Sequence, residues 1–378
     1  MKISHATLRQ FRNHTESVFN FGESINVLLG ENGQGKTNVL EALSFLSLTK
    51  SFYASSDSTV LQQGKDIFEV EGKFLSDVKI FHTVRVAYSE QQKQKKFFVN
   101  TTEIEKLSSV IGQFPIVILS PENNTITFGS PSERRKFLDI VISQSSKAYL
   151  EDSIEYKRIL RQRNKILSEA KGSDCSALID PWDEMLVRHG SKIVLKRAAF
   201  AREFAPYVYT AYSLLVREEE NPIVEYVSQS STPSSATINN ITQEFRRKLE
   251  QKKNDERRLC TTLVGPHRDD LMFSLHSLSL RQFASQGQHK TFLIALKVAE
   301  FFYLKERCGE IPIFLLDDVF SELDEQRSEK LIALIKTLGQ IFITTTSEHV
   351  FNNTLLWNNE CRKFTIKNGA LVSDEVYA

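Results

Sequence analysis

The segment 30–37, GENGQGKT, constrains the fold more than any other part of the chain because it is a complete GxxxxGK[ST] match. An apolar, β-prone stretch at residues 24–29 precedes it, and a helical pattern runs from residue 36 to residue 48. The glycines of the segment allow positive φ angles, so successive backbone N–H groups can point at a phosphate with no side chain in the way. The pattern predicts a strand, a phosphate-binding loop and a helix, in that order, within an α/β fold.

Each position of this loop has an expected task in binding ATP. Lys36 is expected to reach the β- and γ-phosphates and the Thr37 hydroxyl to hold Mg²⁺, while the helix N-terminus adds its dipole. The alternative is a glycine-rich loop that binds no nucleotide, and the flanking strand and helix argue against it. The residues predicted to bind ATP are Gly30, Glu31, Asn32, Gly33, Gln34, Gly35, Lys36, Thr37 and Asn38.

A second apolar stretch, IFLLDD at residues 313–318, ends in two carboxylates. Its four consecutive apolar residues indicate a strand buried in a parallel sheet, and such sheets bind ligands at the carboxyl ends of their strands. Asp317 is expected to hold Mg²⁺ through water. Asp318 is expected to polarise the attacking water as general base, with Lys36 as the other catalytic residue. The alternative for Asp318 is that it only caps the next turn.

Two further short motifs change the class of protein that the sequence suggests. SQGQ at residues 285–288 places a serine and a glycine at the start of an apolar helix, and SELD at residues 321–324 follows the acidic strand. Either motif alone is weak. The order of phosphate loop, helical stretch, serine motif, acidic strand and SELD resembles that of ABC-type ATPase heads. This resemblance implies an α/β fold, namely an ABC-type P-loop ATPase head with a mixed sheet and helices.

In that class, the serine motif is called the signature. The resemblance implies that the signature of one subunit caps the γ-phosphate bound by another subunit. Two ATP molecules would then lie in a head-to-tail homodimer with two-fold symmetry that depends on ATP. The D-loop residues implied in the same way are Ser321 and Asp324. The signature residues would be Ser285, Gln286, Gly287 and Gln288.

The middle of the chain has a different pattern of charged and apolar residues from its two ends. Residues 131–216 carry charged and apolar residues with a helical period, and a charged helix is expected at residues 241–258. Mixed α/β patterns return after residue 260. We therefore expect an ATPase head formed by residues 1–130 with 255–378, and an inserted, mainly helical arm formed by residues 131–254.

Longer blocks that together span nearly the whole chain narrow the resemblance. They are LRQFRNH (8–14), PENNTITFGSPSERRKFLD (121–139), YKRILRQRN (156–164), LVGPHRDDL (263–271), ASQGQHKT (284–291) and LDDVFSELDEQRSEKL (316–331). In these blocks the chain resembles the RecF family. The resemblance implies an ATP-dependent dimer that binds double-stranded and gapped DNA at junctions with single strands. It also implies slow ATP hydrolysis, and work with RecO and RecR to load recombinase in gap repair.

Two departures from related patterns bear on function. Tyr53 stands where many relatives carry arginine, so no basic contact is carried over to that position. Residues 342–347, FITTTS, lack the histidine that follows the last strand in the transporter branch of ABC ATPases, so no switch histidine is assigned. This absence, the aspartate at position 318 and the helical stretch disfavour the runner-up interpretation, an ATP-binding subunit of a membrane transporter. A third interpretation is a nucleotide-gated assembly scaffold with negligible turnover.

Binding to DNA would need local basic surface, because the formal net charge is only +1, from 48 Lys and Arg against 47 Asp and Glu. Arg134 and Arg135 are the candidate DNA contacts, since cations at the start of a helix oppose its dipole and need an acidic or phosphate partner. An internal ion pair is the alternative for them. Lys93, Lys95 and Lys96 and the charged helix are interpreted as exposed surface, and His267 as a structural hinge.

The cysteines and the apolar pattern bear on location. Cys175, Cys260, Cys308 and Cys361 lie far apart and match no metal-binding spacing, which suits a reducing cytosol. No apolar stretch approaches the ~18 residues of a membrane span, and the first residues lack the apolar core of a signal peptide. We expect a cytoplasmic protein with no membrane partner.

Overall fold

The computed structural model describes residues 1–216, 220–229, 237–347 and 360–376. The chain forms two compact units, each assembled from separate stretches of sequence. Unit 1 contains Met1–Asn123, Ser213–Arg217 and Leu296–Ala378, and unit 2 contains Asn124–Tyr212 and Glu218–Ala295. Residues 124–130 and 255–295, which the sequence interpretation assigned to the head, therefore lie in unit 2.

One sheet of unit 1 carries the expected parallel strands. Its order is β15-β14-β3-β13-β12-β8, and the pairs from β14 to β8 are parallel, whereas β15 is antiparallel to β14. The strands β3, β8, β12 and β13 are almost wholly apolar and buried because helices and a second sheet cover them, whereas β14 and β15 at the edge are partly exposed. Their bounds are β3 Ile25–Leu29, β8 Ile116–Leu119, β12 Ile313–Asp317, β13 Ile341–Thr345, β14 Arg362–Lys367 and β15 Ala370–Val376.

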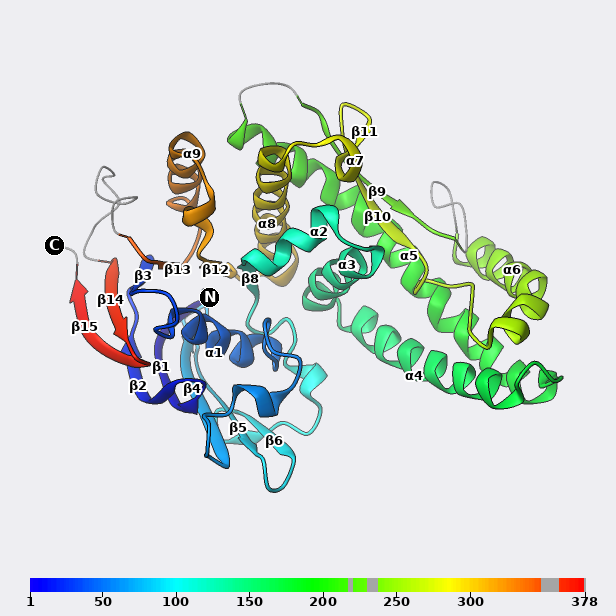
Figure 1. Ribbon diagram of the computed structural model, residues 1–378, viewed down its shortest axis with the longest axis horizontal. Helices are drawn as coiled ribbons and strands as arrows, with labels where there is room; N and C mark the ends of the chain where they lie inside the picture. The colour runs from blue at the N-terminus through cyan, green and yellow to red at the C-terminus, as the bar shows by residue number, and fades with distance from the viewer. Residues whose placement is uncertain (217–219, 230–236, 348–359, 377–378) are drawn as a thin grey trace. The chain divides into compact units, whose positions relative to one another are not determined.

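The second sheet of unit 1 is antiparallel, with the order β2-β1-β4-β5-β6-β7. Helix α1 (Lys36–Leu48) packs against both sheets, and it is buried almost all round (Figure 1). Phe11, Phe45 and Phe68 meet edge to face at its side, with ring centroids 5.4–5.7 Å apart. The strands are β1 Lys2–Phe11, β2 His14–Asn20, β4 Ile67–Leu75, β5 Phe81–Ser89, β6 Gln94–Val99 and β7 Thr102–Glu103.

Short helical segments complete unit 1. Helix α9 (Glu325–Ile335) follows β12 through the single turn η5 (Val319–Glu322). The turn η1 (Asp57–Val60) lies between α1 and β4, η2 (Leu107–Ser109) lies between β7 and β8, and η3 (Pro121–Asn124) follows β8. The carboxyl ends of β3, β12 and β8 therefore lead into the phosphate loop, η5 and η3, which places these three segments at one edge of the parallel sheet.

Unit 2 is mainly helical but contains a three-stranded antiparallel sheet, β11-β10-β9, that the sequence analysis did not predict. Among the helices of the described chain, none is long and apolar enough to cross a membrane. The strands are β9 Pro222–Val227, β10 Asp270–Leu275 and β11 Leu278–Ser279. The helices are α2 Thr125–Phe128, α3 Pro131–Ser145, α4 Lys147–Ala170, α5 Ser176–Leu215, α6 Ile238–Leu259, α7 Leu280–Phe283 and α8 Gln286–Cys308.

A buried arginine ties helices α4, α5 and α6 together. Arg163 of α4 is 2% exposed and donates to Asp183 Oδ1 of α5 and to Glu256 Oε2 of α6, both at 2.6 Å. Its third nitrogen donates to the Thr262 hydroxyl at 2.9 Å. The guanidinium therefore has a partner for each of its three nitrogens, which a buried cation requires.

Candidate nucleotide-binding site

The phosphate loop has the backbone that the glycines predict. β3 ends at Leu29, α1 begins at Lys36, and Gly33 and Gly35 have φ angles of 78° and 109°. A Cβ at Gly35 would lie 2.6 Å from Asn13 Oδ1, and the His14 ring Nε2 lies 3.1 Å from Gly35 O. The turn between β1 and β2 therefore packs against the end of the loop and leaves space only for glycine there.

Lys36 holds the loop from within. Its side chain is buried, and Nζ donates to Gly30 O at 2.5 Å and to Glu31 O at 2.8 Å. Burial lowers the pKa of the Lys36 ammonium, and the carboxylates of Asp318 and Asp317 oppose that shift. The Lys36 ammonium thus lies against the backbone of the phosphate loop, where it could contact a bound phosphate.

Thr37 and Asp317 meet at the edge of the parallel sheet. The Thr37 hydroxyl donates to Asp317 Oδ1 at 2.7 Å, and the Thr344 hydroxyl donates to the same oxygen at 2.7 Å. Burial raises the pKa of the Asp317 carboxyl, and the two hydroxyl donors oppose that shift. The sequence analysis missed Thr344, which the parallel register places directly beside Asp317.

Asp318 lies one residue further along, with its backbone in the left-handed region at φ 50° and ψ 30°. Its N–H donates to Thr344 Oγ1 at 2.8 Å. The side chain makes no capping hydrogen bond to η5, so the structure does not support the alternative in which Asp318 only caps the next turn. Instead, Asp318 is part of a cavity wall. Non-glycine residues with positive φ are uncommon and cluster at functional sites.

A cavity of about 370 Å³ lies along the first turn of α1. It falls within the size range of small-molecule pockets. Residues from α1, from the end of β12, from η3 and from the segment after α1 share its wall. They are Arg12, Thr37, Asn38, Glu41, Tyr53, Pro121, Glu122, Asp317 and Asp318.

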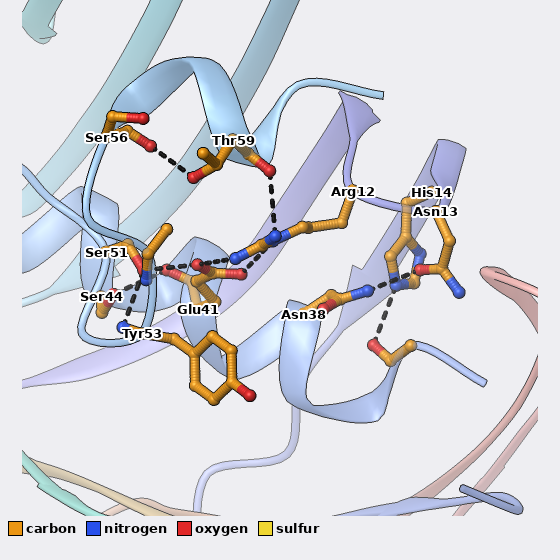
Figure 2. Close-up of polar contacts among 12 residues, drawn as sticks. Arg12, Asn13, His14, Asn38, Glu41, Ser44, Ser51, Tyr53, Ser56 and Thr59 are labelled. Carbon is orange, nitrogen blue, oxygen red and sulfur yellow. Dashed lines mark hydrogen bonds and ion pairs between the residues drawn. The ribbon is translucent and has the colours of Figure 1, made fainter. Parts of the chain in front are cut away.

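A polar network supports one wall of this cavity (Figure 2). Glu41 is 1% exposed, and Arg12 donates to both of its oxygens, from Nε at 2.7 Å and from Nη2 at 2.8 Å. The Ser51 hydroxyl also donates to Glu41, and Arg12 Nη1 donates to Thr59 O at 2.9 Å. The sequence analysis assigned no role to these residues because they meet only through the packing of β1 on α1.

The described residues fit an ATP-bound Mg²⁺ ion. They include no group of three or more His, Cys, Asp or Glu that could hold a metal ion unaided. Mg²⁺ bound with nucleotide usually uses one or two carboxylates, the phosphates and water, which suits the Thr37–Asp317 pair. Ser120, which follows the end of β8, is 3% exposed, and its hydroxyl has no hydrogen-bond partner among the described residues. Such an unpartnered hydroxyl at the same sheet edge suits a site that takes up water or phosphate oxygens.

The signature motif forms the start of α8 in unit 2. The Gln288 N–H donates to Ser285 Oγ at 3.2 Å, and the Ser285 N–H donates to Gln288 Oε1 at 2.9 Å, which is a capping box. Ser285 and Gln286 are exposed, and Gly287 O accepts from the Thr291 hydroxyl at 2.9 Å. The cap leaves the N-terminus of α8 exposed. The role of the motif in a dimer stays a prediction.

The two D-loop residues shape the turn from β12 to α9. The Ser321 hydroxyl donates to Asp318 O at 2.8 Å. Asp324 caps α9 by accepting from the Arg327 N–H at 2.9 Å, and it pairs with Arg327 Nη1 at 2.7 Å. Both residues have a local structural task, and their contact with a second subunit stays a prediction.

Arg134 forms an internal ion pair within unit 2. It is 6% exposed, and its Nε and Nη2 each donate to a different oxygen of Asp270 at 2.8 Å. Arg135 Nη1 donates to Asp269 O at 2.8 Å. The internal ion pair that the sequence analysis gave as the alternative therefore describes Arg134, and a contact of either arginine with DNA stays a prediction.

The other cationic segments and His267 also have internal partners. Lys95 pairs with Asp57 at 2.7 Å and is largely buried, in contrast to the exposed turn expected there. His267 Nδ1 lies 2.7 Å from the Tyr156 hydroxyl, and burial lowers the pKa of the imidazole to about 4. The cations of α6 fit the expected exposed, balanced surface, with the pairs Arg246–Glu184, Arg247–Glu244, Lys252–Asp255 and Arg258–Asp255.

Comparisons with known proteins agree with this architecture. The family model described as RecF/RecN/SMC N terminal domain matches residues 2–370. A solved Smc head bound to the C-terminal winged-helix domain of ScpA aligns over 100% of this chain and 98% of its own, with a TM-score of 0.53 and 13% sequence identity. The fold is therefore that of an ABC-type ATPase head of the RecF, RecN and SMC class.

Two curated relatives and a solved structure narrow the class. The DNA replication and repair protein RecF of Chloroherpeton thalassium is 45% identical over 93% of this chain and 96% of its own length. That of Salinibacter ruber is 42% identical over 92% and 85%. A structure of the recombination mediator protein RecF with ATP, in the RecFOR pathway, has a TM-score of 0.90 and 28% identity over 99% of this chain and 97% of its own. The chain belongs to the RecF family.

Proposed function

We propose that the chain is an ATP-dependent DNA-binding protein of recombinational repair and replication maintenance in the cytoplasm. It forms a homodimer when ATP and Mg²⁺ bind, and the dimer holds DNA at junctions of single and double strands. With RecO and RecR it helps to load recombinase on gaps, and its ATP hydrolysis is slow and stimulated by DNA. Unit 1 is the nucleotide-binding part, and the helices of unit 2 act as the arm.

The observation that carries this proposal is the convergence of Lys36, Thr37 and Asp317 at one sheet edge, in a chain of the RecF family. Lys36 would bind the β- and γ-phosphates, and the Thr37 hydroxyl and Asp317 would hold Mg²⁺, directly and through water. Bound there, Mg²⁺ would neutralise charge on the phosphate oxygens. The Asp318 carboxylate would accept a hydrogen bond from the attacking water and orient it.

The relatives' printed names support the wider role. Curated relatives are called DNA replication and repair proteins, and the similar solved structure is described as part of the RecFOR pathway. In a dimer, the signature motif of each subunit would cap the nucleotide bound at the phosphate loop of the other subunit.

Light scattering with and without nucleotide tests the dimer. We expect the mass of the purified protein to double with ATP and Mg²⁺, but not with ADP or without nucleotide. Ser285→Arg places bulk and charge at the exposed start of α8, so it should permit ATP binding and block the doubling. A wild-type mass that is indifferent to nucleotide would contradict the proposal.

Phosphate release separates the proposed ATPase from a scaffold with negligible turnover. Asp318→Ala removes the carboxylate that would orient the attacking water, so release in the presence of junction DNA should fall by about 100-fold. Equal background rates in the wild type and Asp318→Ala would favour the scaffold.

A further inference from the structure

Tyr53 presents an aromatic ring to the wall of the nucleotide cavity. Its side chain is 58% exposed, and it shares the cavity with Thr37, Asp317 and Asp318. A large aromatic ring that is exposed and yet forms part of a cavity wall offers a flat apolar surface to a ligand. Figure 2 shows the ring beside the Glu41 network, at the end of the segment that follows α1.

The backbone that carries Tyr53 is held to α1. The Ser51 hydroxyl accepts hydrogen bonds from the N–H groups of Tyr53 at 2.8 Å and Ala54 at 2.6 Å, and it donates to the buried Glu41. Arg12 satisfies both oxygens of Glu41 and donates to Thr59 O. The turn at residues 51–54 therefore has fixed partners, so the ring starts from a defined position.

Helix α1 joins this turn to the phosphate site. Thr37, Asn38 and Glu41 lie at positions i, i+1 and i+4 of α1, and all three line the cavity. One rigid element therefore carries both the hydroxyl expected at Mg²⁺ and the carboxylate that fixes the Tyr53 turn. A ligand bound at Thr37 could reach Tyr53 within the same cavity of about 370 Å³.

The Tyr53 ring favours a ligand with an aromatic heterocycle, which could stack on it. The Arg12 guanidinium carbon lies 6.0 Å from the centroid of the Tyr53 ring, and its charge is paired with Glu41. Tyr53 thus gives the cavity wall an aromatic face, and the same wall carries the Thr37 hydroxyl and the carboxylates of Asp317 and Asp318. Bases stack on aromatic side chains, and such stacking contributes about 1–3 kcal/mol per base.

We propose that Tyr53 is a specificity-determining residue that contacts the base of the nucleotide, and that Glu41 is its positioning residue. The proposal rests on the proposed function, because it needs the phosphates to bind at residues 30–37.

Calorimetric titration of the whole chain with two ligands tests the contact. The ligands are ATP and inorganic tripolyphosphate, each with Mg²⁺, because tripolyphosphate has the phosphates without the base. Tyr53→Ala should weaken ATP binding about 5- to 100-fold and leave tripolyphosphate binding unchanged, and Tyr53→Phe should retain ATP affinity. Tyr209→Ala, which removes a 50% exposed tyrosine of α5 in unit 2, is the matched control and should change neither affinity.

The outcomes separate this proposal from the proposed function. If the wild type binds neither ligand, the proposed function is wrong. If the wild type binds ATP and Tyr53→Ala binds it equally well, only the contact with the base is wrong. Equal weakening of ATP and tripolyphosphate by Tyr53→Ala would also overturn the proposal, because it would show an effect on the phosphate site.

A double-mutant cycle tests the positioning role of Glu41. Glu41→Gln keeps the volume but breaks the charge pair with Arg12, so it should weaken ATP binding about 3- to 10-fold in the wild-type background. In the Tyr53→Ala background it should have no further effect. Full additivity of the two losses, or an equal loss of tripolyphosphate affinity, would overturn the assignment. Thermal unfolding of each variant checks that the fold is retained.

Discussion

The Lys36 ammonium donates to two carbonyls of the loop that it follows, so it stabilises the phosphate loop and also supplies its positive charge. Lys36→Ala should lower ATP affinity by roughly 100-fold or more, because charge-assisted hydrogen bonds to phosphate are among the strong ones. Titration with a fluorescent ATP analogue measures the loss. Lys65→Ala, which removes an exposed lysine elsewhere in unit 1, should bind the analogue as the wild type does. Retained tight binding in Lys36→Ala would contradict the assignment of the loop.

Thr344 positions the Asp317 carboxylate and the Asp318 backbone at the edge of the sheet, since it donates to Asp317 Oδ1 and accepts from the N–H of Asp318. Thr344→Val keeps the shape but removes both bonds. We expect about a 10-fold higher Mg²⁺ concentration for half-maximal nucleotide binding, because residues that orient metal ligands have effects of this size. Thr344→Ser keeps the hydroxyl and should restore the wild-type value. An unchanged Mg²⁺ requirement in Thr344→Val would show that Asp317 needs no such support.

The sequence predicted the phosphate loop and Asp317, which each lie in a recognisable local motif, and it missed Thr344 and the Arg12–Glu41 pair, which no local motif marks. Residues 30–37 are contiguous, so their spacing alone predicts the loop. Thr344 lies beside Asp317 only because β13 pairs with β12, and Arg12 reaches Glu41 only because β1 packs on α1. Such pairings depend on strand order, which a single sequence does not state.

At the scale of elements, Arg163 joins three helices of unit 2 through Asp183, Glu256 and Thr262. Arg163→Met would leave the carboxylate of Glu256, itself 1% exposed, without its cation, so the free energy of unfolding should fall by about 3–5 kcal/mol. Denaturation by urea measures the change. Arg158→Met on the same helix removes an exposed pair with Glu155 and a contact with the Trp182 ring, 6.0 Å away, and should cost about 1 kcal/mol or less. Similar effects of the two substitutions would mean that the buried cluster contributes little.

The periodic elements were predicted well because their patterns are local. Helix α1 has the predicted bounds, and β3 and β12 lie in the predicted apolar stretches. The strands β9, β10 and β11 were missed because they have only two to six residues, too few for a clear period-2 pattern. Residues 230–236, between β9 and α6 in the chain, lie outside the described residues.

At the scale of the whole molecule, His267 makes stability depend on pH. Its folded pKa of about 4 lies below the ordinary value of 6.5, so the unfolded chain binds more protons between these values. The contribution of neutral His267 is therefore fully present above pH 6.5 and is lost as the pH falls towards 4, by up to about 3 kcal/mol. Urea denaturation from pH 7 to pH 4 measures this loss.

The matched variant for this prediction is His267→Gln, because an amide can donate to Thr262 O and accept from Tyr156 but does not take up a proton in this range. We expect the free energy of unfolding to fall less steeply with decreasing pH in the variant than in the wild type. The difference in slope should correspond to the uptake of about one proton on unfolding. Equal slopes in the two proteins would show that another group dominates the response.

The boundary between the units was predicted only in outline. The sequence placed residues 255–295 with the head because α/β patterning returns after residue 260, yet β10 and the first half of α8 pack in unit 2. The cause is β9, which precedes α6 and pairs with β10, so the two strands bracket the charged helix. A change from helical to mixed α/β residue patterns along a chain therefore need not coincide with the boundary of a compact unit.

Two helices, α5 and α8, cross between the units within their own length. A shuffled module normally ends in a loop, where residues can be added or lost freely. Here a splice at residue 295 would fall inside a helix that turns about 100° per residue, so one inserted residue would put the two halves of α8 out of phase. The arm and the head are therefore expected to be inherited together, with insertions confined to the loops and not to these two helices.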